Sequence, residues 1–135
     1  PKKGNKVVVV GGDNYRIGLG GGSVSSVDTG RYSSGIELNA VQRANPEMQK
    51  RANNLVRALC EEDVNPVVSI HDHGSAGHVN CLSELVDECG GKIDMTKLPI
   101  GDPTLSSKEI IANESQERMG LLIDEEHIEH VRKIA

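Results

Sequence analysis

The sequence predicts a single domain of the α/β or α+β class, in which a mixed β-sheet packs against helices over residues 1–135. Short apolar runs that end at glycine or proline alternate along the chain with longer segments of helical spacing. Neither an internal repeat nor a polar linker divides the 135 residues. Apolar residues make up 36% and charged residues 26%, a balance that is typical of a folded globular domain.

Four short segments are predicted to be β-strands. The first contains four consecutive valines and ends at Gly11-Gly12, which is typical of a buried strand. The second follows the pair Asn65-Pro66, which breaks the preceding helix. The four segments are Lys6–Val10, Val67–Ile70, Lys92–Met95 and Arg118–Ile123.

Four segments are predicted to be helices. The clearest has Asn45 as N-cap, Pro46 at the first helical position and Glu47 in the first turn. The pair Gly90-Gly91 provides a stop for the second helix. The expected helices run from Pro46 to about Glu62, from Val79 to Cys89, from a cap at Ser106 or Ser107 through Ile111, and from a cap at Asp124 to the last residue.

Composition excludes several classes of protein. No apolar run approaches the ~20 residues that a membrane-spanning helix needs. The net charge of −5, without a basic patch, disfavours nucleic acid and anionic membranes as partners. Three widely spaced cysteines do not form a disulfide framework, which indicates a reducing, cytoplasmic compartment. We expect Cys60, Cys81 and Cys89 to be small core residues on apolar helical faces.

The core is expected to be unusual, because the chain has no Phe, no Trp and only two Tyr. Large aromatic side chains normally dominate core burial, so here aliphatic residues must fill the core. An aromatic-poor core and a last helix without a stop signal suggest a piece of a longer protein. An unpaired sheet edge would then favour a homodimer.

A glycine-rich segment, Gly18–Ser26, is the first candidate for chemistry, and we call it the glycine loop. Consecutive glycines expose backbone N–H groups that can hold an anion, so Gly20, Gly21, Gly22 and Ser23 are candidates for phosphate binding. The segment matches neither the P-loop nor the dinucleotide-binding pattern. The alternative is a turn that needs several residues with positive φ.

The segment His71–His78 follows the second predicted strand and is the second candidate. Alternation along an extended chain would group His71 with His73, and His78 could then complete a zinc site. No further cluster of cysteines or carboxylates supplies the missing ligands, which disfavours zinc. A single acidic ligand for Mg²⁺, Asp72, fits a glycine-rich turn just past a strand end better.

Two polar segments carry little information by themselves. Asn113–Glu117 lies between a short helix and a strand, and composition alone favours a solvated loop. Asn39–Arg43, which contains Gln42, is equally unspecific.

Taken in order, four segments resemble one family, the phosphoribosylformylglycinamidine synthases of purine biosynthesis. The segments are GLGGGSVSS (18–26), VQRANPE (41–47), HDHGSAGHVN (71–80) and NESQER (113–118). The resemblance covers nearly the whole chain and points to the first of two AIR synthase-related C-terminal-type domains in the large, single-chain form. It implies that the final strands of such a domain are missing from this chain. One departure is Ser75, where the family pattern leads us to expect alanine.

The resemblance implies that formylglycinamide ribonucleotide, ATP and glutamine give the amidine, ADP, phosphate and glutamate. Asp72 would be a ligand for Mg²⁺, whereas Gln42 and the triplet Glu114, Ser115 and Gln116 would contact the ribonucleotide. Ammonia would come from a separate glutaminase domain, and other domains would supply the catalytic histidine and most ATP contacts. The chain alone is therefore expected to be inactive.

Two other functions remain open. The same loops would suit a structural or allosteric nucleotide-binding module of the same synthetase superfamily. The second alternative is a stand-alone metal hydrolase, which predicts tight zinc binding and activity without partners.

Overall fold

The computed structural model describes every residue except Arg43, and at Gly22, Ser25 and Gln116 it describes the backbone alone. It confirms the α+β class. In the described chain, β1 (Lys6–Val10), β2 (Val67–His73) and β3 (Ser115–Ile123) form one sheet in the order β1-β3-β2. Both strand pairings are antiparallel, so the described sheet is not the mixed sheet that was predicted; an isolated parallel bridge, outside the three strands, joins Asn14 to Ile100.

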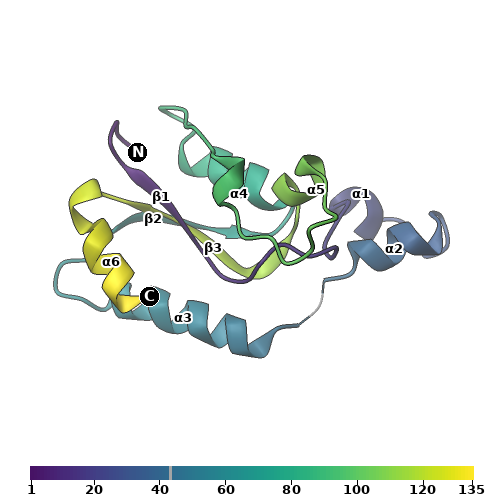
Figure 1. Ribbon diagram of the computed structural model, residues 1–135, viewed down its shortest axis with the longest axis horizontal. Helices are drawn as coiled ribbons and strands as arrows, with labels where there is room; N and C mark the ends of the chain where they lie inside the picture. The colour runs from purple at the N-terminus through teal and green to yellow at the C-terminus, as the bar shows by residue number, and fades with distance from the viewer. Residues whose placement is uncertain (43) are drawn as a thin grey trace.

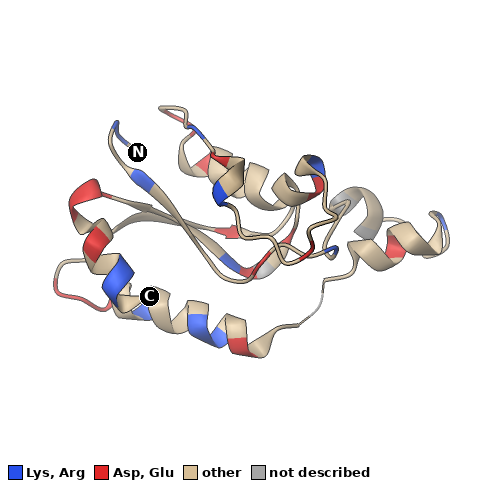
Figure 2. Cartoon of the chain, viewed as in Figure 1, with Lys and Arg blue, Asp and Glu red and all other residues tan. Residues whose placement is uncertain are grey.

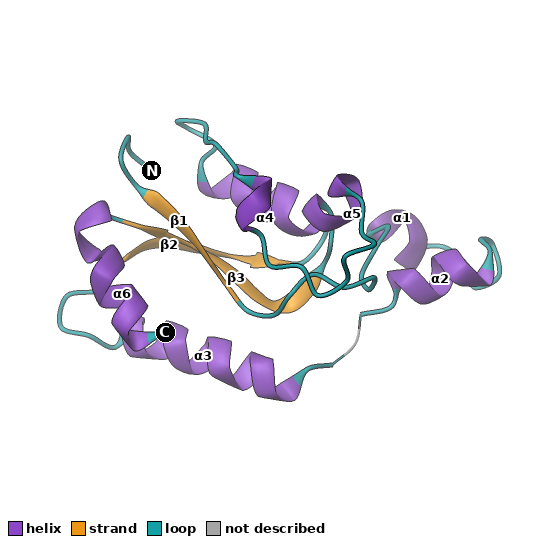
Figure 3. Ribbon diagram, viewed as in Figure 1, coloured by secondary structure: helices purple, strands orange, loops and turns teal. Residues whose placement is uncertain are grey.

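Helices cover both faces of the sheet (Figure 1). On one face lie α3 (Pro46–Cys60) and α6 (Ile128–Ile134), and on the other lies α4 (Gly77–Leu85), with α5 (Ser107–Ile111) beside it (Figure 3). Two short helices, α1 (Gly22–Ser25) and α2 (Ser34–Ala40), extend away from the sheet at one end. No described helix is long and apolar enough to cross a membrane.

The central strand β3 explains how a core without Phe or Trp is filled. Leu121 and Ile123 are fully buried and point to the α3 and α6 face, where Leu59 and Val131 join them. Leu122 points to the opposite face. There the buried partners are Cys81, Leu82 and Leu85 of α4. Two thin aliphatic clusters, one on each side of the sheet, therefore replace a single aromatic core.

Several predicted boundaries are confirmed. Strand β1 has the expected bounds, and α3 begins at Pro46 with the Asn45 side chain accepting a hydrogen bond from the Met48 N–H at 3.1 Å. Ser106 caps α5 through a capping box with Glu109. Lys and Arg are interspersed with Asp and Glu over the surface, consistent with the net charge of −5 (Figure 2).

One predicted strand is wrong. Residues 92–94 form no strand, and Met95–Lys97 is a short 3-10 helix, η1. The Asp94 side chain accepts hydrogen bonds from the backbone N–H and the hydroxyl of Thr96, which stabilises a turn instead of an extended chain. Ile93 is exposed, so burial of its side chain does not stabilise pairing with the sheet.

Other boundaries shift. Strands β2 and β3 extend into the polar segments, to His73 and from Ser115, because the two strands pair with each other there. Helix α4 ends at Leu85, four residues before the predicted end. Asp124 does not cap the last helix with its side chain, which instead accepts a hydrogen bond from Asn5 and pairs with Lys2. A 3-10 helix, η2 (Glu125–His127), precedes α6.

The expectation that all three cysteines are core residues is correct only for Cys81, which is fully buried in α4. Cys60 is exposed, because the neighbouring Leu59 occupies the inward face at the end of α3. Cys89 is exposed because it lies past the end of α4.

Candidate functional site

The carboxylate of Glu114 is the point at which the predicted site segments meet. Glu114 lies between α5 and β3 and is only 9% exposed. Its Oε1 accepts a hydrogen bond from the backbone N–H of Ala76 at 2.9 Å. Gln42 donates from Nε2 to Glu114 Oε2 at 3.4 Å. The structure therefore brings together Gln42, the turn after Asp72 and the beginning of the NESQER segment.

The glycine loop lies against the same residue. The backbone N–H of Glu114 donates to the carbonyl of Gly18 at 3.2 Å, and the Gly18 N–H donates to the Val41 carbonyl at 3.3 Å. A Cβ placed on Gly21 would lie 2.7 Å from Glu114 Oε1, and one on Gly18 would lie 2.5 Å from the Glu114 carbonyl oxygen. Only glycine fits this close approach, so part of the glycine content serves contact with Glu114.

The other candidates for phosphate binding lie at the tip of the loop. Gly20 has a φ of 97°, which is a conformation that glycine adopts readily. Gly22 begins α1, and Ser23 is exposed on it. The turn interpretation therefore accounts for Gly18, Gly20 and Gly21, and phosphate binding at Gly20–Ser23 stays a prediction.

A strained turn links β2 to α4. Ala76 has a φ of 62° and a ψ of 14°, the left-handed region, and among the described residues it is the one non-glycine with positive φ. This conformation directs the Ala76 N–H toward Glu114. Backbone strain of this kind persists where surrounding contacts fix it, and here the contact is the Glu114 carboxylate.

Asp72, the predicted metal ligand, is an exposed residue of β2, one position before the end of the strand and not just past it as predicted, because β2 stays paired with β3 there. Its Oδ1 accepts a hydrogen bond from the Gly74 N–H at 2.7 Å, which orients the carboxylate. No group of three His, Cys, Asp or Glu side chains that could hold a metal ion is found among the described residues. One oriented carboxylate does fit Mg²⁺, which commonly takes one or two protein carboxylates and completes its shell with water and phosphate oxygens.

The remaining predicted substrate residues lie in β3. Ser115 is 3% exposed and is paired with His73 of β2. The backbone of Gln116 belongs to β3, but its side chain lies outside the described residues.

The three histidines of the zinc hypothesis have different partners. His73 Nε2 and His78 Nδ1 are 3.0 Å apart, with the rings edge to face. His71 is instead paired with Glu84 of α4. The histidines therefore do not converge on one point.

The structure also shows a buried polar network that sequence reasoning missed. Its members are Asn14, His73, His78, Asn113 and Arg118, all 1% exposed or less. A signal was present, since Arg118 is a lone cation at the start of the apolar run Met119–Ile123. Two partners of Arg118, the carbonyls of Gly12 and Asp13, lie more than a hundred positions away in the sequence, which no local pattern reveals.

Burial and the charge of Arg118 keep both network histidines neutral. Burial lowers the pKa of His73 to about 4, and the nearby guanidinium contributes in the same direction. The same two causes, in the same order, lower the pKa of His78 to about 3. Burial also lowers the pKa of Arg118, to about 10, so the guanidinium keeps its charge at neutral pH.

The chain was compared with known proteins. Residues 2–135 match the family described as AIR synthase related protein, C-terminal domain. The chain is 43% identical over 139 residues to phosphoribosylformylglycinamidine synthase of Dictyostelium discoideum, covering 100% of this chain and 10% of that protein. It is 45% identical over 125 residues to the Homo sapiens enzyme of the same name, covering 91% and 9%.

Solved structures agree with these relatives. A structure described as T. maritima PurL complexed with FGAR superposes with a TM-score of 0.85 at 26% identity, covering 99% of this chain and 22% of that chain. A second, described as T. maritima PurL complexed with ATP, has a TM-score of 0.74 at 24% identity and shares the fold. The chain spans about a tenth of the length of the two synthases that it matches. Because the family match extends over nearly all of its residues, the chain belongs to the AIR synthase related protein, C-terminal domain, family.

Proposed function

We propose that this chain forms part of the substrate site of a phosphoribosylformylglycinamidine synthase. The observation that carries the proposal is the convergence on Glu114 of Gln42, the turn after Asp72 and the glycine loop. These are the segments that carry the resemblance, and they are brought together from positions up to 96 residues apart. The likeness to a PurL structure complexed with FGAR supports the same substrate class.

In this proposal each residue type suits its role. The side chains of Gln42, Glu114, Ser115 and Gln116 contact the ribonucleotide, since amide, hydroxyl and carboxylate groups recognise ribose hydroxyls and the formylglycinamide amide. The backbone N–H groups of Gly20–Ser23 contact a phosphate. ATP activates the amide oxygen of the substrate, and ammonia from a glutaminase domain then displaces phosphate.

Asp72 would hold Mg²⁺ in this site, with the carboxylate already oriented by the Gly74 N–H. When bound, the ion neutralises charge on the transferred phosphoryl group. The chain contributes contacts and not a complete catalytic apparatus. The isolated chain is therefore inactive, and activity requires the other domains of the longer protein, including the glutaminase domain.

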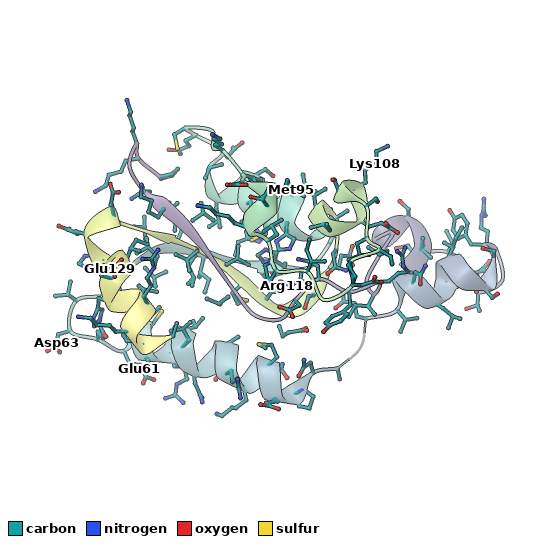
Figure 4. The ribbon with its side chains drawn as sticks, in the orientation of Figure 1. Glu61, Asp63, Met95, Lys108, Arg118 and Glu129 are labelled. Atoms are coloured by element: carbon teal, nitrogen blue, oxygen red, sulfur yellow. The ribbon has the colours of Figure 1, made fainter. Side chains whose placement is uncertain are left out.

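The proposal is tested in the full-length enzyme by steady-state kinetics of glutamine-dependent amidine formation. Asp72→Asn should raise the Mg²⁺ concentration needed for half-maximal rate, because the amide is a weaker ligand than the carboxylate. Glu114→Gln should raise KM for formylglycinamide ribonucleotide by about tenfold, since a charged hydrogen bond is worth roughly 1.5–3 kcal/mol. Asp63→Asn is the matched control, because Asp63 lies on an exposed loop at the opposite end of the molecule from Lys108 of α5, the helix that precedes Glu114 (Figure 4).

The result also separates this role from the structural alternative. Wild-type kinetics in both folded variants would contradict the proposal. If those variants also lost nucleotide that co-purifies with the wild type, the loops would belong to a structural or allosteric nucleotide module.

A further inference from the structure

Arg118 is a buried cation without a carboxylate partner among the described side chains. It is 1% exposed, and no ion pair to it is found in the part of the chain that the structure describes. A buried charge costs several kcal/mol unless hydrogen bonds compensate it. The hydrogen-bond acceptors around Arg118 must therefore compensate its buried charge.

The donors of Arg118 go to two segments that carry the candidate site. Nε donates to the Gly12 carbonyl at 3.0 Å, and Nη2 donates to the Asp13 carbonyl at 3.2 Å. Nη1 donates to the Asn113 carbonyl at 3.1 Å, and Nη2 donates to Asn113 Oδ1 at 2.5 Å. One guanidinium thus ties the chain entering the glycine loop to the residue that precedes Glu114. Arg118 is labelled in Figure 4.

Asn113 extends the same connection. Its Nδ2 donates to the carbonyls of Tyr15, at 2.7 Å, and Ile17, at 2.5 Å. The backbone from residue 12 to residue 17 is therefore bonded at four carbonyls to just two side chains, and Gly18 follows directly.

The first residues of α4 contact Arg118 and Asn113 as well. His78 Nε2 lies 3.0 Å from Asn14 Oδ1 and 3.1 Å from Arg118 Nη1. A Cβ on Gly77 would collide with the Asn113 carbonyl, so α4 approaches Asn113 as closely as glycine permits. The strained Ala76 N–H that contacts Glu114 immediately precedes this contact.

We infer that Arg118 is a positioning residue for the Glu114–Gln116 triplet, acting through Asn113 and the two carbonyls of residues 12 and 13. The inference rests on the proposed function of that triplet. Arginine suits this role because its planar fork presents five donors in a fixed geometry. Lysine would keep the charge but has one ammonium on a flexible stem, so it cannot reach the same carbonyls together.

The test uses the full-length enzyme and compares Arg118→Lys, Glu114→Gln and the double variant. We expect Arg118→Lys to raise KM for formylglycinamide ribonucleotide by about tenfold, with KM for glutamine unchanged, because a displaced triplet would lose about one charged hydrogen bond to the ribonucleotide. The double variant should be far less impaired than the product of the single effects, because residues that act on one contact are not additive. Arg57→Lys, on the exposed face of α3, is the matched control.

Asn113→Asp provides a second variant should Arg118→Lys fail to fold. The carboxylate still accepts from Arg118 and supplies a counterion, but it cannot donate to the carbonyls of Tyr15 and Ile17. The same rise in KM for the ribonucleotide is expected. Lowered melting temperature with unchanged KM, or multiplicative effects in the double variant, would overturn the inference. If Glu114→Gln itself leaves KM unchanged, the proposed function fails as well.

Discussion

At the scale of single residues, Ala76 has an unfavourable left-handed backbone conformation that its hydrogen bond to Glu114 stabilises. An L-residue in the left-handed region is less favourable by about 1 kcal/mol, whereas glycine has no such penalty. We therefore expect Ala76→Gly to raise the free energy of unfolding by about 0.5–1 kcal/mol, since the hydrogen bond from the N–H to Glu114 is retained. Urea unfolding of the 135-residue chain measures the difference.

A glycine substitution at an unstrained alanine tests whether backbone strain is the cause. Ala112 has a φ of −99°, which any residue adopts, so Ala112→Gly should lower the stability by a similar amount through the entropy of the unfolded chain. Equal destabilisation by both glycine substitutions would show that Ala76 carries no strain.

The two network histidines predict how stability depends on pH. In the folded chain the pKa of His73 is about 4, held down by burial and by Arg118, whereas in the unfolded chain it is about 6.5. Between these values only the unfolded chain binds the proton, so stability is complete above about pH 6.5 and falls as the pH drops toward 4. For His73 alone, the full loss is on the order of 3 kcal/mol.

The charged groups that act on His73 are Arg118 and His71, which oppose protonation, and Asp72, which favours it. Urea unfolding at pH 7.5, 6 and 5 follows the loss. His73→Gln keeps a donor near the position of Nε2 and removes the titration, so its stability should fall less steeply over this range. An unchanged slope in this variant would assign the pH dependence to other groups.

At the scale of elements, the packing of α4 on β3 depends on Gly120. A Cβ at this position would lie 2.6 Å from Cys81 Sγ and 2.8 Å from Leu85 Cδ1. Gly120→Ala should therefore lower the free energy of unfolding by about 1–3 kcal/mol, the usual cost of overpacking a core.

A second substitution tests this explanation. Cys81→Ala removes the Sγ atom and makes room for the new methyl group. The double variant should be more stable than the sum of the single effects predicts, because the two sites share one contact. Additive losses would mean that Gly120 serves backbone conformation and not the approach of α4.

The sequence predicted those elements whose signals are local. The valine run of β1, the Asn45 cap of α3 and the capping box of α5 each contain their own cause within a few residues. The polar ends of β2 and β3 were not predicted as strand, because only pairing across 40 or more residues makes His73 and Ser115 extended. The prediction of a strand at Lys92–Met95 was wrong for the opposite reason. Its apolar pattern is local, but Ile93 is exposed and does not pack on the sheet.

The candidate site shows the same division. The resemblance predicts that Gln42, Asp72 and Glu114 belong to one site, which stays a prediction. The structure shows the hydrogen bonds that join Gln42 and Ala76 to the Glu114 carboxylate. Arg118 was not singled out, because its role depends on carbonyls of residues 12 and 13. Every residue has a backbone carbonyl, so the sequence does not reveal which carbonyls accept a hydrogen bond from Arg118. Only the three-dimensional structure does.

At the scale of the whole molecule, the three-stranded sheet leaves β1 and β2 as edges. Edge strands with apolar side chains favour pairing with another chain. In β2, Val68 is 49% and Ile70 is 38% exposed, and the strand has no Lys, Arg or Glu; its one carboxylate, Asp72, lies next to its end. Helix α2 adds exposed Ile36 and Leu38 at the end of the molecule, where it stands away from the sheet.

We therefore expect the isolated 135-residue chain to form a homodimer through the β2 edge. Light scattering at increasing concentration should show a mass that rises toward twice 14.5 kDa. Ile70→Lys places a charge on the edge and should restore the monomer, whereas Val64→Lys, in the exposed loop before β2, should not. A monomeric mass at high concentration would contradict the dimer, and equal effects of both lysines would assign the association to net charge and not to the strand edge.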